Sequence, residues 1–184
     1  GNAITFPYNF PVGTTVVSVL VTDIHANTAA CSYMVVVEDD ELPIVNCPQA
    51  EIQYTADAGE CNATLSFEVA STDNCGVATT QYKIGGQPIS FPYDFPIGST
   101  MVQVYVTDIH GNIALCTFTI IVEDHENPII ECEVPAASYS ADSGDCDATL
   151  SFTSTSTDNC GIAGTEYSIG GSLITFPYDF PVGT

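Results

Sequence analysis

Positive charge is almost absent from this sequence. Of its 184 residues, Lys83 alone is lysine or arginine, against 23 aspartates and glutamates, and the net charge is −22 at pH 7. This balance argues against nucleic acid and against an anionic membrane surface, because both are bound through Lys and Arg. It favours a cationic partner, with divalent cations as the candidates. The alternative is an acidic surface that is only solvated.

Long apolar stretches, tryptophan and helical periodicity are also missing. No stretch reaches the roughly 20 uninterrupted apolar residues that cross a membrane, so we expect no membrane insertion in this segment. The eight cysteines form no Cys-x-x-Cys pair, which argues against zinc knuckles and redox motifs. A regular, even set of cysteines favours disulfides in an oxidising compartment, and the expected location is therefore extracellular or at a cell surface.

One motif occurs three times at a constant spacing of 85 residues. It reads FPYNFPVGT at 6–14, FPYDFPIGS at 91–99 and FPYDFPVGT at 176–184. The cysteines follow the same rule, since they are four positions that each recur 85 residues later. Self-similarity at a fixed period predicts a tandem array, in which the repeat is the folding unit.

Two acid-rich joints that end in proline, 38–43 and 123–128, mark the predicted boundaries. They divide the chain into a partial copy at 1–40, a complete copy at 41–125 and a second partial copy at 126–184. Partial sandwiches would expose core and strand edges, so we do not expect an isolated monomer. Either the sequence is one segment of a longer periodic chain, or neighbouring copies of the protein complete the end copies in a polymer or array.

The complete copy alternates apolar and polar residues over short stretches bounded by turn residues. About seven strands in 85 residues predict an all-β fold of tandem immunoglobulin-like (fibronectin III-like) β-sandwiches. The segment 71–76 is expected to be a loop and 108–112 a tight turn. The expected strands are 52–54, 63–69, 77–84, 89–91, 100–107 and 114–122.

Three motifs together resemble a known family. They are the start Pro43…Cys47-Pro48, the loop STDNCG at 71–76, and FPYDFPIGST followed by VYVTDIHGNIALCTF at 104–118. In this order they resemble the hyalin repeat, or HYR domain, an extracellular immunoglobulin-like module of animal adhesion proteins and repetitive bacterial surface proteins. The resemblance covers the whole chain, and it implies an adhesive or structural role without catalytic activity. Histidines at 25 and 110 depart from the family pattern, and we attach no chemistry to them.

In such a sandwich the first and the last strand begin at the same end of the domain. Cys47 starts the first strand and Cys116 starts the last, so we expect these two to pair, closing about 70 residues. The rival pairs Cys31–Cys47 and Cys116–Cys132 would need atoms roughly 25 Å either side of an extended joint to meet, and we reject them. Cys31 and Cys132 are then expected to find partners outside this sequence.

The remaining cysteines predict two further bonds, Cys61–Cys75 and Cys146–Cys160, each closing about 14 residues. One topological reservation applies to both. Cys61 precedes a strand and Cys75 follows it, so the chain must double back for the two to meet.

The same topology predicts a calcium site at each joint. It places the incoming joint, the 71–76 loop and the 108–112 turn at one end of the central copy, and calcium needs six to eight oxygen ligands. The alternative is that these residues only cap turns through their own backbone hydrogen bonds. The predicted ligands are Asp39, Asp40, Glu41, Asp73, Asn74, Asp108 and Asn112 at the first joint, and Glu123, Asp124, Glu126 and Asp158 at the second.

The sequence therefore predicts a structural or adhesive segment of a long extracellular repeat protein that forms a rod or filament. Asp108 and His110 have no nucleophile motif beside them, so we expect no enzyme. The second hypothesis is a spacer or carbohydrate-binding module of a secreted enzyme. On that hypothesis Phe91, Tyr93 and Phe95 would form a sugar-stacking platform, whereas on the first they close the sandwich.

Overall fold

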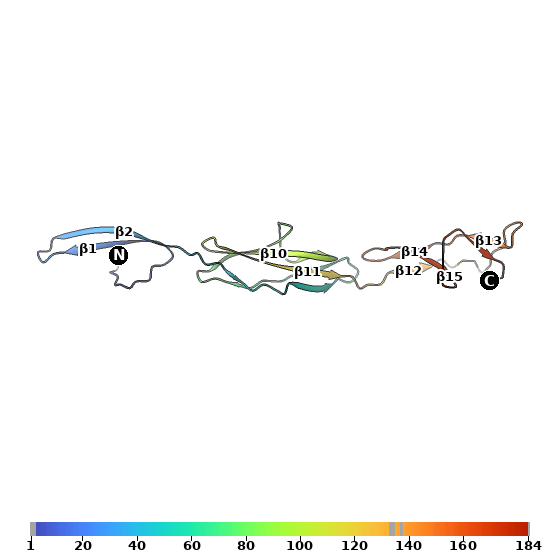
Figure 1. The fold of residues 1–184 in the computed structure, drawn as a ribbon, viewed down its shortest axis with the longest axis horizontal. Coiled ribbons are helices and arrows are strands. Elements are labelled where there is room, and N and C mark those ends of the chain that lie inside the picture. Colours follow the sequence, from blue (N-terminus) through green and yellow to red (C-terminus); the bar gives the residue numbers. More distant parts are fainter. Residues whose placement is uncertain (1–2, 133–134, 137, 184) are drawn as a thin grey trace. The chain divides into compact units, whose positions relative to one another are not determined.

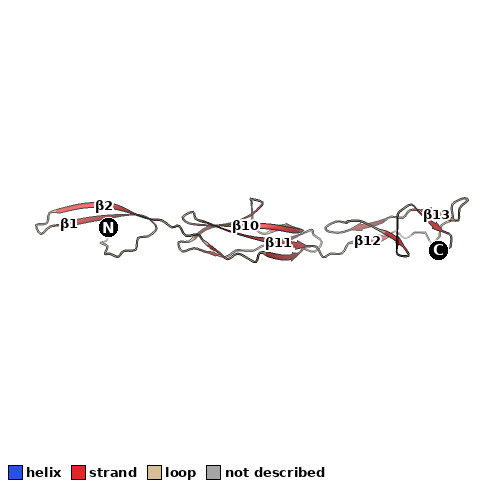
Figure 2. Ribbon diagram, in the orientation of Figure 1, coloured by secondary structure: helices blue, strands red, loops and turns tan. Residues whose placement is uncertain are grey.

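A computed structural model describes residues 3–132, 135–136 and 138–183 (Figure 1). Small parts of the two predicted partial copies, at 1–2, 133–134, 137 and 184, lie outside these residues. The described chain consists of strands and connecting segments without a helix (Figure 2), which confirms the all-β prediction. Among these residues there is consequently no helix long and apolar enough to cross a membrane.

The described residues form seventeen strands, most of them short. Their bounds are β1 Gly13–Thr22, β2 Thr28–Val37, β3 Ile44–Val45, β4 Glu51–Thr55, β5 Asn62–Leu65, β6 Ser71–Thr72, β7 Val77–Ile84, β8 Gln87–Ile89, β9 Tyr93–Pro96, β10 Gly98–Asp108, β11 Ile113–Glu123, β12 Ile129–Cys132, β13 Asp147–Leu150, β14 Ser154–Thr157, β15 Tyr167–Ile169, β16 Ser172–Ile174 and β17 Tyr178–Pro181.

Most of the strands expected between residues 51 and 123 are present, with three differences. The strand expected over 63–69 ends at Leu65, and the strand expected over 89–91 lies at Gln87–Ile89. The expected loop contains β6, which pairs antiparallel with β3. Part of the Pro-rich motif is also a strand, since β9 pairs antiparallel with β5 and sets Phe95 opposite Ala63. Alternation alone missed β6 and β9, because strands of two to four residues are too short to show a period.

The largest sheet has five strands in the order β4-β11-β10-β7-β8, with β4 parallel to β11 and β7 antiparallel to β10. Alternate residues of β10 are fully buried, at Val102, Val104 and Val106. The inward positions of β11 behave in the same way, at Cys116, Phe118, Ile120 and Val122. This period of two is what a sheet with one buried face requires.

The aromatic residues of the Pro-rich motif pack on one another. Phe95 is fully buried, and its ring centroid lies 4.9 Å from that of Tyr93 and 6.3 Å from that of Phe67. Phe67 also meets Phe91, at 4.3 Å. The equivalent rings Phe152, Phe176, Tyr178 and Phe180 make counterpart contacts. These rings therefore belong to the packing and do not form an open stacking platform.

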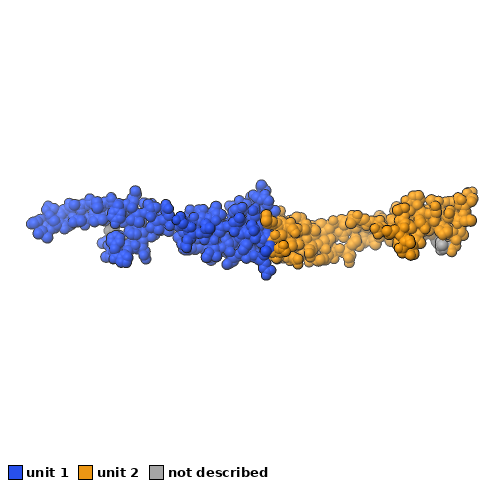
Figure 3. All heavy atoms as spheres, viewed as in Figure 1, with its two compact units in different colours: residues 1–50, 68–89, 102–118 blue, residues 51–67, 90–101, 119–184 orange. Residues whose placement is uncertain are grey.

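By its internal contacts the chain divides into two compact units (Figure 3). Unit 1 comprises Gly1–Ala50, Glu68–Ile89 and Val102–Phe118, and unit 2 comprises Glu51–Phe67, Ser90–Met101 and Thr119–Thr184. Strands β10 and β11 contribute residues to both. The units do not follow the three predicted copies, whose boundaries stay a prediction.

The hairpin β1–β2 exposes apolar residues whose counterparts in β10 and β11 are buried. Val21 is 62% exposed, whereas Val106, 85 residues later, is fully buried. Tyr33 is 46% exposed and its counterpart Phe118 only 2%. The same sequence pattern is thus a core in one place and an uncovered face in the other.

This contrast gives a matched pair of variants. Val106→Ala removes buried methyl groups and should lower the free energy of unfolding by about 2 kcal/mol. Val21→Ala makes the same change on the exposed hairpin, and in dilute protein it should change stability by less than about 0.5 kcal/mol. Urea unfolding, monitored by tyrosine fluorescence, measures the free energy of unfolding of both variants. Equal losses would show that the two hairpins are buried alike.

Candidate functional site

The turn after β10 is built around the carboxylate of Asp108. Its Oδ1 accepts hydrogen bonds from the backbone N–H groups of His110 (2.8 Å), Gly111 (2.6 Å) and Asn112 (2.8 Å), and its Oδ2 accepts one from Asn112 Nδ2 (2.7 Å). Gly111 has a φ of 97°, which glycine adopts without strain. Asp108 is 2% exposed. Burial raises its pKa, but the bonds from Asn112, His110 and Gly111 outweigh burial and lower it, so Asp108 stays ionised.

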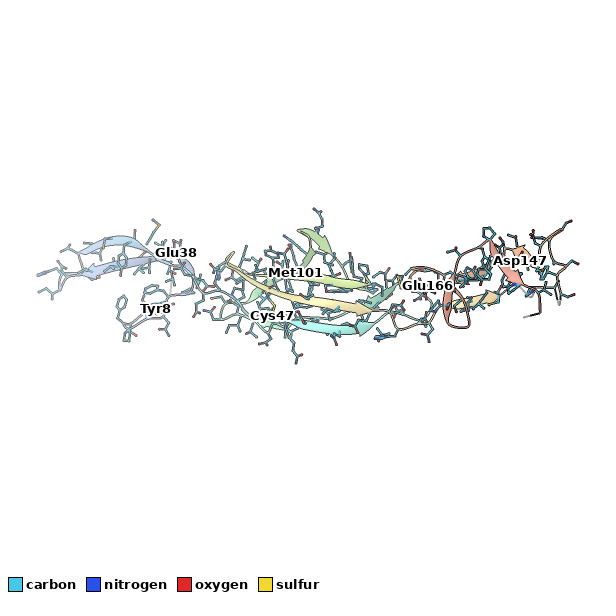
Figure 4. The ribbon with its side chains drawn as sticks, turned by 45° about the vertical axis from the view of Figure 1, so that its right-hand side comes forward. Tyr8, Glu38, Cys47, Met101, Asp147 and Glu166 are labelled. Carbon is cyan, nitrogen blue, oxygen red and sulfur yellow. A yellow bond between two sulfur atoms is a disulfide. The ribbon has the colours of Figure 1, made fainter. Side chains whose placement is uncertain are left out.

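Asp39 reaches this turn from the segment after β2, where Glu38 is labelled in Figure 4. Asn112 Nδ2 donates to the backbone oxygen of Asp39 at 2.8 Å, and Asp39 Oδ2 lies 3.0 Å from His110 Nδ1. The Asp39 side chain is only 3% exposed. His110, for which the sequence predicts no role, is therefore the partner of Asp39. Nothing in the spacing of the sequence signals this contact.

Asp73 comes from the loop after β6, and its Oδ1 accepts the N–H groups of Cys75 and Gly76, both at 2.9 Å. One carboxylate oxygen from each of Asp39, Asp73 and Asp108 lies within 4.8 Å of the other two. We call these three residues the carboxylate cluster. Of the other predicted ligands, Asp40, Glu41 and Asn74 are exposed and Asn112 lies beside the cluster.

The carboxylate cluster concentrates negative charge in a place with little water. At an effective dielectric constant of about 20, two like charges this close repel by roughly 3–4 kcal/mol. Buried charges of this kind are normally paired or bound to a metal. Oxygen donors from three segments suit calcium or another hard cation.

A second set of ligand atoms, on Asp39, Cys75 and His110, also lies within 4.8 Å. It would suit a softer metal only if the Cys75 thiol ionised. Burial, a hydrogen bond to Asp39 and the charges of Asp39, Asp73 and Asp108 all raise the pKa of Cys75. The thiol form is thereby favoured, and the carboxylate cluster is the better candidate.

The predicted ligands of the second joint are spread more widely. Glu126 accepts the N–H group of Gly59 at 3.0 and 3.2 Å, and Asn159 Nδ2 donates to the backbone oxygen of Glu60 at 2.8 Å. Glu126 and Asp158 line one hollow of about 520 Å³. Glu123 Oε2 lies 3.4 Å from His125 Nε2. Asp124 and Asp158 each accept a hydrogen bond from the backbone N–H group two residues further along the chain. The turn containing Gly59 and Glu60 thus contacts this joint.

The disulfides agree with the prediction in one place and differ in the other. Cys47, labelled in Figure 4, is bonded to Cys116 with a Cα–Cα distance of 5.8 Å, as expected. Cys61 is bonded to Cys160, 99 residues away, with a Cα–Cα distance of 4.9 Å.

The predicted pairs Cys61–Cys75 and Cys146–Cys160 are therefore not formed, and Cys75 and Cys146 are free thiols. The reservation about chain direction explains the error. β5 and β6 lie between Cys61 and Cys75 and carry the chain from the Glu126 joint to the Asp39 joint, so the two sulfurs have different neighbours.

The Asp108 turn has a counterpart that serves as a control. Asp23 accepts the same bonds from His25 and Asn27, but it is exposed. Asp108→Ala should lower the melting temperature by several degrees, because it leaves part-buried N–H groups without an acceptor. Asp23→Ala should lower it less, since water can replace the lost bonds.

The pH dependence of Asp108→Ala has a definite sign. The folded pKa of Asp108 is lowered, so its contribution to stability is complete above the unfolded value of about 3.9 and is lost as the pH falls through the folded value. Melting curves from pH 7 to pH 3 should show the difference between wild type and variant shrink below about pH 4. A constant difference would contradict this account.

Comparison with known proteins identifies the family. The HYR domain model matches residues 38–122. Hyalin of Lytechinus variegatus is 30% identical over 190 residues, covering 95% of this chain and 35% of that protein. Hyalin of Strongylocentrotus purpuratus is 38% identical over 120 residues, which is 62% of this chain and 10% of hyalin.

A rat protein named for sushi, von Willebrand factor type A, EGF and pentraxin domains is 34% identical over 110 residues, or 59% of this chain and 3% of that protein. The chain thus spans about a third or less of these relatives. It belongs, through residues 38–122, to the HYR domain family.

Proposed function

We propose that the chain is a structural or adhesive segment of a long extracellular protein, in which 85-residue sandwiches at 1–40, 41–125 and 126–184 form a rod or filament with calcium at the joints. The observation that carries this proposal is the carboxylate cluster. It gathers the joint residue Asp39 with Asp73 and Asp108 of the next copy, so a cation held there connects two copies.

Turn capping explains only part of the carboxylate cluster. The backbone bonds to Asp73 and Asp108 would form in these turns without Asp39, as they do around Asp23. They do not explain why a third carboxylate, 3% exposed, is brought against two others. A calcium ion would offset that repulsion and would fix the direction of the chain as it enters the copy.

The second joint has equivalent groups. Asp124 and Asp158, 85 residues after Asp39 and Asp73, are half-buried, and Asn159 Oδ1 is the one buried side-chain oxygen or nitrogen of the described chain that lacks a hydrogen-bond partner. A carbonyl oxygen in this state is a suitable ligand for a hard cation. Without cations, the acidic copies would repel one another over the Debye length of about 8 Å.

An extracellular structural role fits the remaining observations. Two disulfides favour an oxidising compartment. Two of the relatives are named hyalin, and another is named for several modules combined in one protein. Both oxygens of Asp108 are occupied by turn N–H groups and the Asn112 amide, so Asp108 is not arranged as a catalytic base. The packed aromatic rings favour this role over carbohydrate binding.

Calcium should raise the thermal stability of the chain. At about a hundred times its Kd, a ligand of the folded state adds about 2.7 kcal/mol, on the order of 10 °C in melting temperature for a domain of this size. Asp39→Asn and Asp73→Asn should each reduce the rise, whereas Asp179→Asn, an exposed carboxylate elsewhere, should leave it unchanged. Scanning calorimetry with calcium or with a chelator measures this. The same melting temperature with calcium and with the chelator would show that the acidic residues of the joints are only solvated charges.

The chain should also associate with itself. With calcium, sedimentation velocity should show species that grow with protein concentration, and negative-stain electron microscopy should show filaments. The β1–β2 face provides the reason, since its exposed apolar residues would gain burial against another copy. A chain that stays monomeric at all concentrations would remove the filament from the proposal and leave the calcium site as a separate question.

A further inference from the structure

The bond Cys61–Cys160 differs in kind from Cys47–Cys116. Cys47 and Cys116 are 69 residues apart and lie within one 85-residue copy. Cys61 and Cys160 are 99 residues apart, so the bond joins a cysteine of one copy to one of the next. The two bonds use each of the four repeated cysteine positions once. The four free thiols, Cys31, Cys75, Cys132 and Cys146, are again one of each position.

These two separations give each free thiol a counterpart on another copy. If a second chain is numbered as though it followed two repeat lengths further along, its Cys31 comes 69 positions after Cys132. This is the separation between Cys47 and Cys116, which are bonded. In the same numbering its Cys75 comes 99 positions after Cys146, which is the separation between the bonded Cys61 and Cys160. We infer that Cys132 and Cys146 of one molecule of this sequence form disulfides with Cys31 and Cys75 of a second molecule. This inference rests on the self-association proposed above.

Both halves of the Cys61–Cys160 contact already exist at the free thiols. On the Cys61 side, the turn is held by Asp57 Oδ2, which accepts the N–H of Thr64 at 2.8 Å, and Gly59 has a φ of 77°. On the Cys146 side, Asp142 Oδ2 accepts the N–H of Thr149 at 3.0 Å, and Gly144 has a φ of 97°. The turn that carries Cys146 therefore has its docking conformation before any partner binds.

On the other side of the contact, the loops that carry Cys160 and Cys75 have matching hydrogen bonds. Asp158 Oδ1 accepts the N–H of Cys160 at 2.9 Å, and Asp73 Oδ1 accepts that of Cys75 at the same distance. The bond between Gly59 and Glu126 would have its counterpart between Gly144 and Glu41 of the second copy.

The exposed hairpin supplies the surface for the second bond. Cys31 is in β2, beside the exposed Tyr33, and Cys132 ends β12. In the central copy, where Cys47 and Cys116 are bonded, the counterpart Phe118 is 2% exposed. Docking of the second copy's β1–β2 hairpin on β12–β17 would bury Tyr33 and Val21 and bring Cys31 to Cys132.

The chemistry needs an oxidant. Each bond forms when two thiols lose two protons and two electrons to a small-molecule disulfide, which is reduced to its two thiols. Exchange first forms a mixed disulfide between one protein cysteine and the small molecule. The thiol of the docked partner then attacks the protein sulfur and releases the small molecule as its second thiol.

Two variants separate directed pairing from random oxidation. The first, Cys31→Ser with Cys75→Ser, keeps only Cys132 and Cys146 free. The second, Cys132→Ser with Cys146→Ser, keeps only Cys31 and Cys75 free. Each is incubated at micromolar concentration with oxidised glutathione, alone and mixed, and the products are followed on non-reducing gels and by mass spectrometry of cross-linked peptides.

The mixture should give one covalent heterodimer that grows no further, with the peptides Cys132–Cys31 and Cys146–Cys75. It should form roughly a hundredfold faster than either homodimer, since docked thiols meet at an effective concentration near millimolar. The unaltered chain should give a ladder of oligomers with the same two peptides. The intrachain bonds Cys47–Cys116 and Cys61–Cys160, checked in each digest, show that the variants are folded.

Three outcomes would overturn the inference. They are homodimers that form as fast as the heterodimer, the crossed peptides Cys31–Cys146 and Cys75–Cys132, and folded chains without cross-links. Sedimentation of the same samples distinguishes this failure from that of the proposed function. Chains that associate while their thiols stay free keep the self-association and lose only the disulfides, whereas chains that stay apart lose both.

Discussion

The joint depends on the way in which the Asp108 carboxylate is held. Three backbone N–H groups and the amide of Asn112 fix its two oxygens, and the same amide binds the backbone of the incoming chain at Asp39. One turn thus determines both the position of a buried charge and the path by which the chain enters the copy. The same turn presents His110 to Asp39, and it contacts the loop that carries Asp73, since the N–H of Ile109 donates to the backbone oxygen of Gly76 at 3.0 Å.

Charge and covalent bonding act at the same joints. At the first, the carboxylate cluster lies beside the free thiol of Cys75. At the second, the counterpart Cys160 is already bonded, and Glu126 and Asn159 hold the turn that carries its partner Cys61. The predicted copies at 41–125 and 126–184 are therefore connected by a peptide segment, by hydrogen bonds and by a disulfide. Such redundancy suits a protein whose joints must resist separation.

Local patterns predicted the long strands and failed where distant residues meet. Alternation located β7, β10 and β11 because strands of eight to eleven residues show their period clearly. The bond Cys47–Cys116 followed from the ends of the first and last strands. Cys61–Cys160 did not, because the prediction paired cysteines within one 85-residue copy, whereas these two are 99 residues apart and lie in two of the predicted copies. The partnership of His110 and Asp39 was missed for the same reason, since 71 residues separate them.

The Cys61–Cys160 bond has a mechanical consequence. If the chain is pulled from its ends, tension passes from Cys61 through the two sulfurs to Cys160 and bypasses the residues between them. A stretch of about 98 residues, which fully extended would reach roughly 330 Å, cannot be drawn out even if its strands come apart. The segment therefore yields little length under load. It behaves as a tether of fixed reach, and it converts a force that would unravel an unlinked sandwich into tension on a covalent bond.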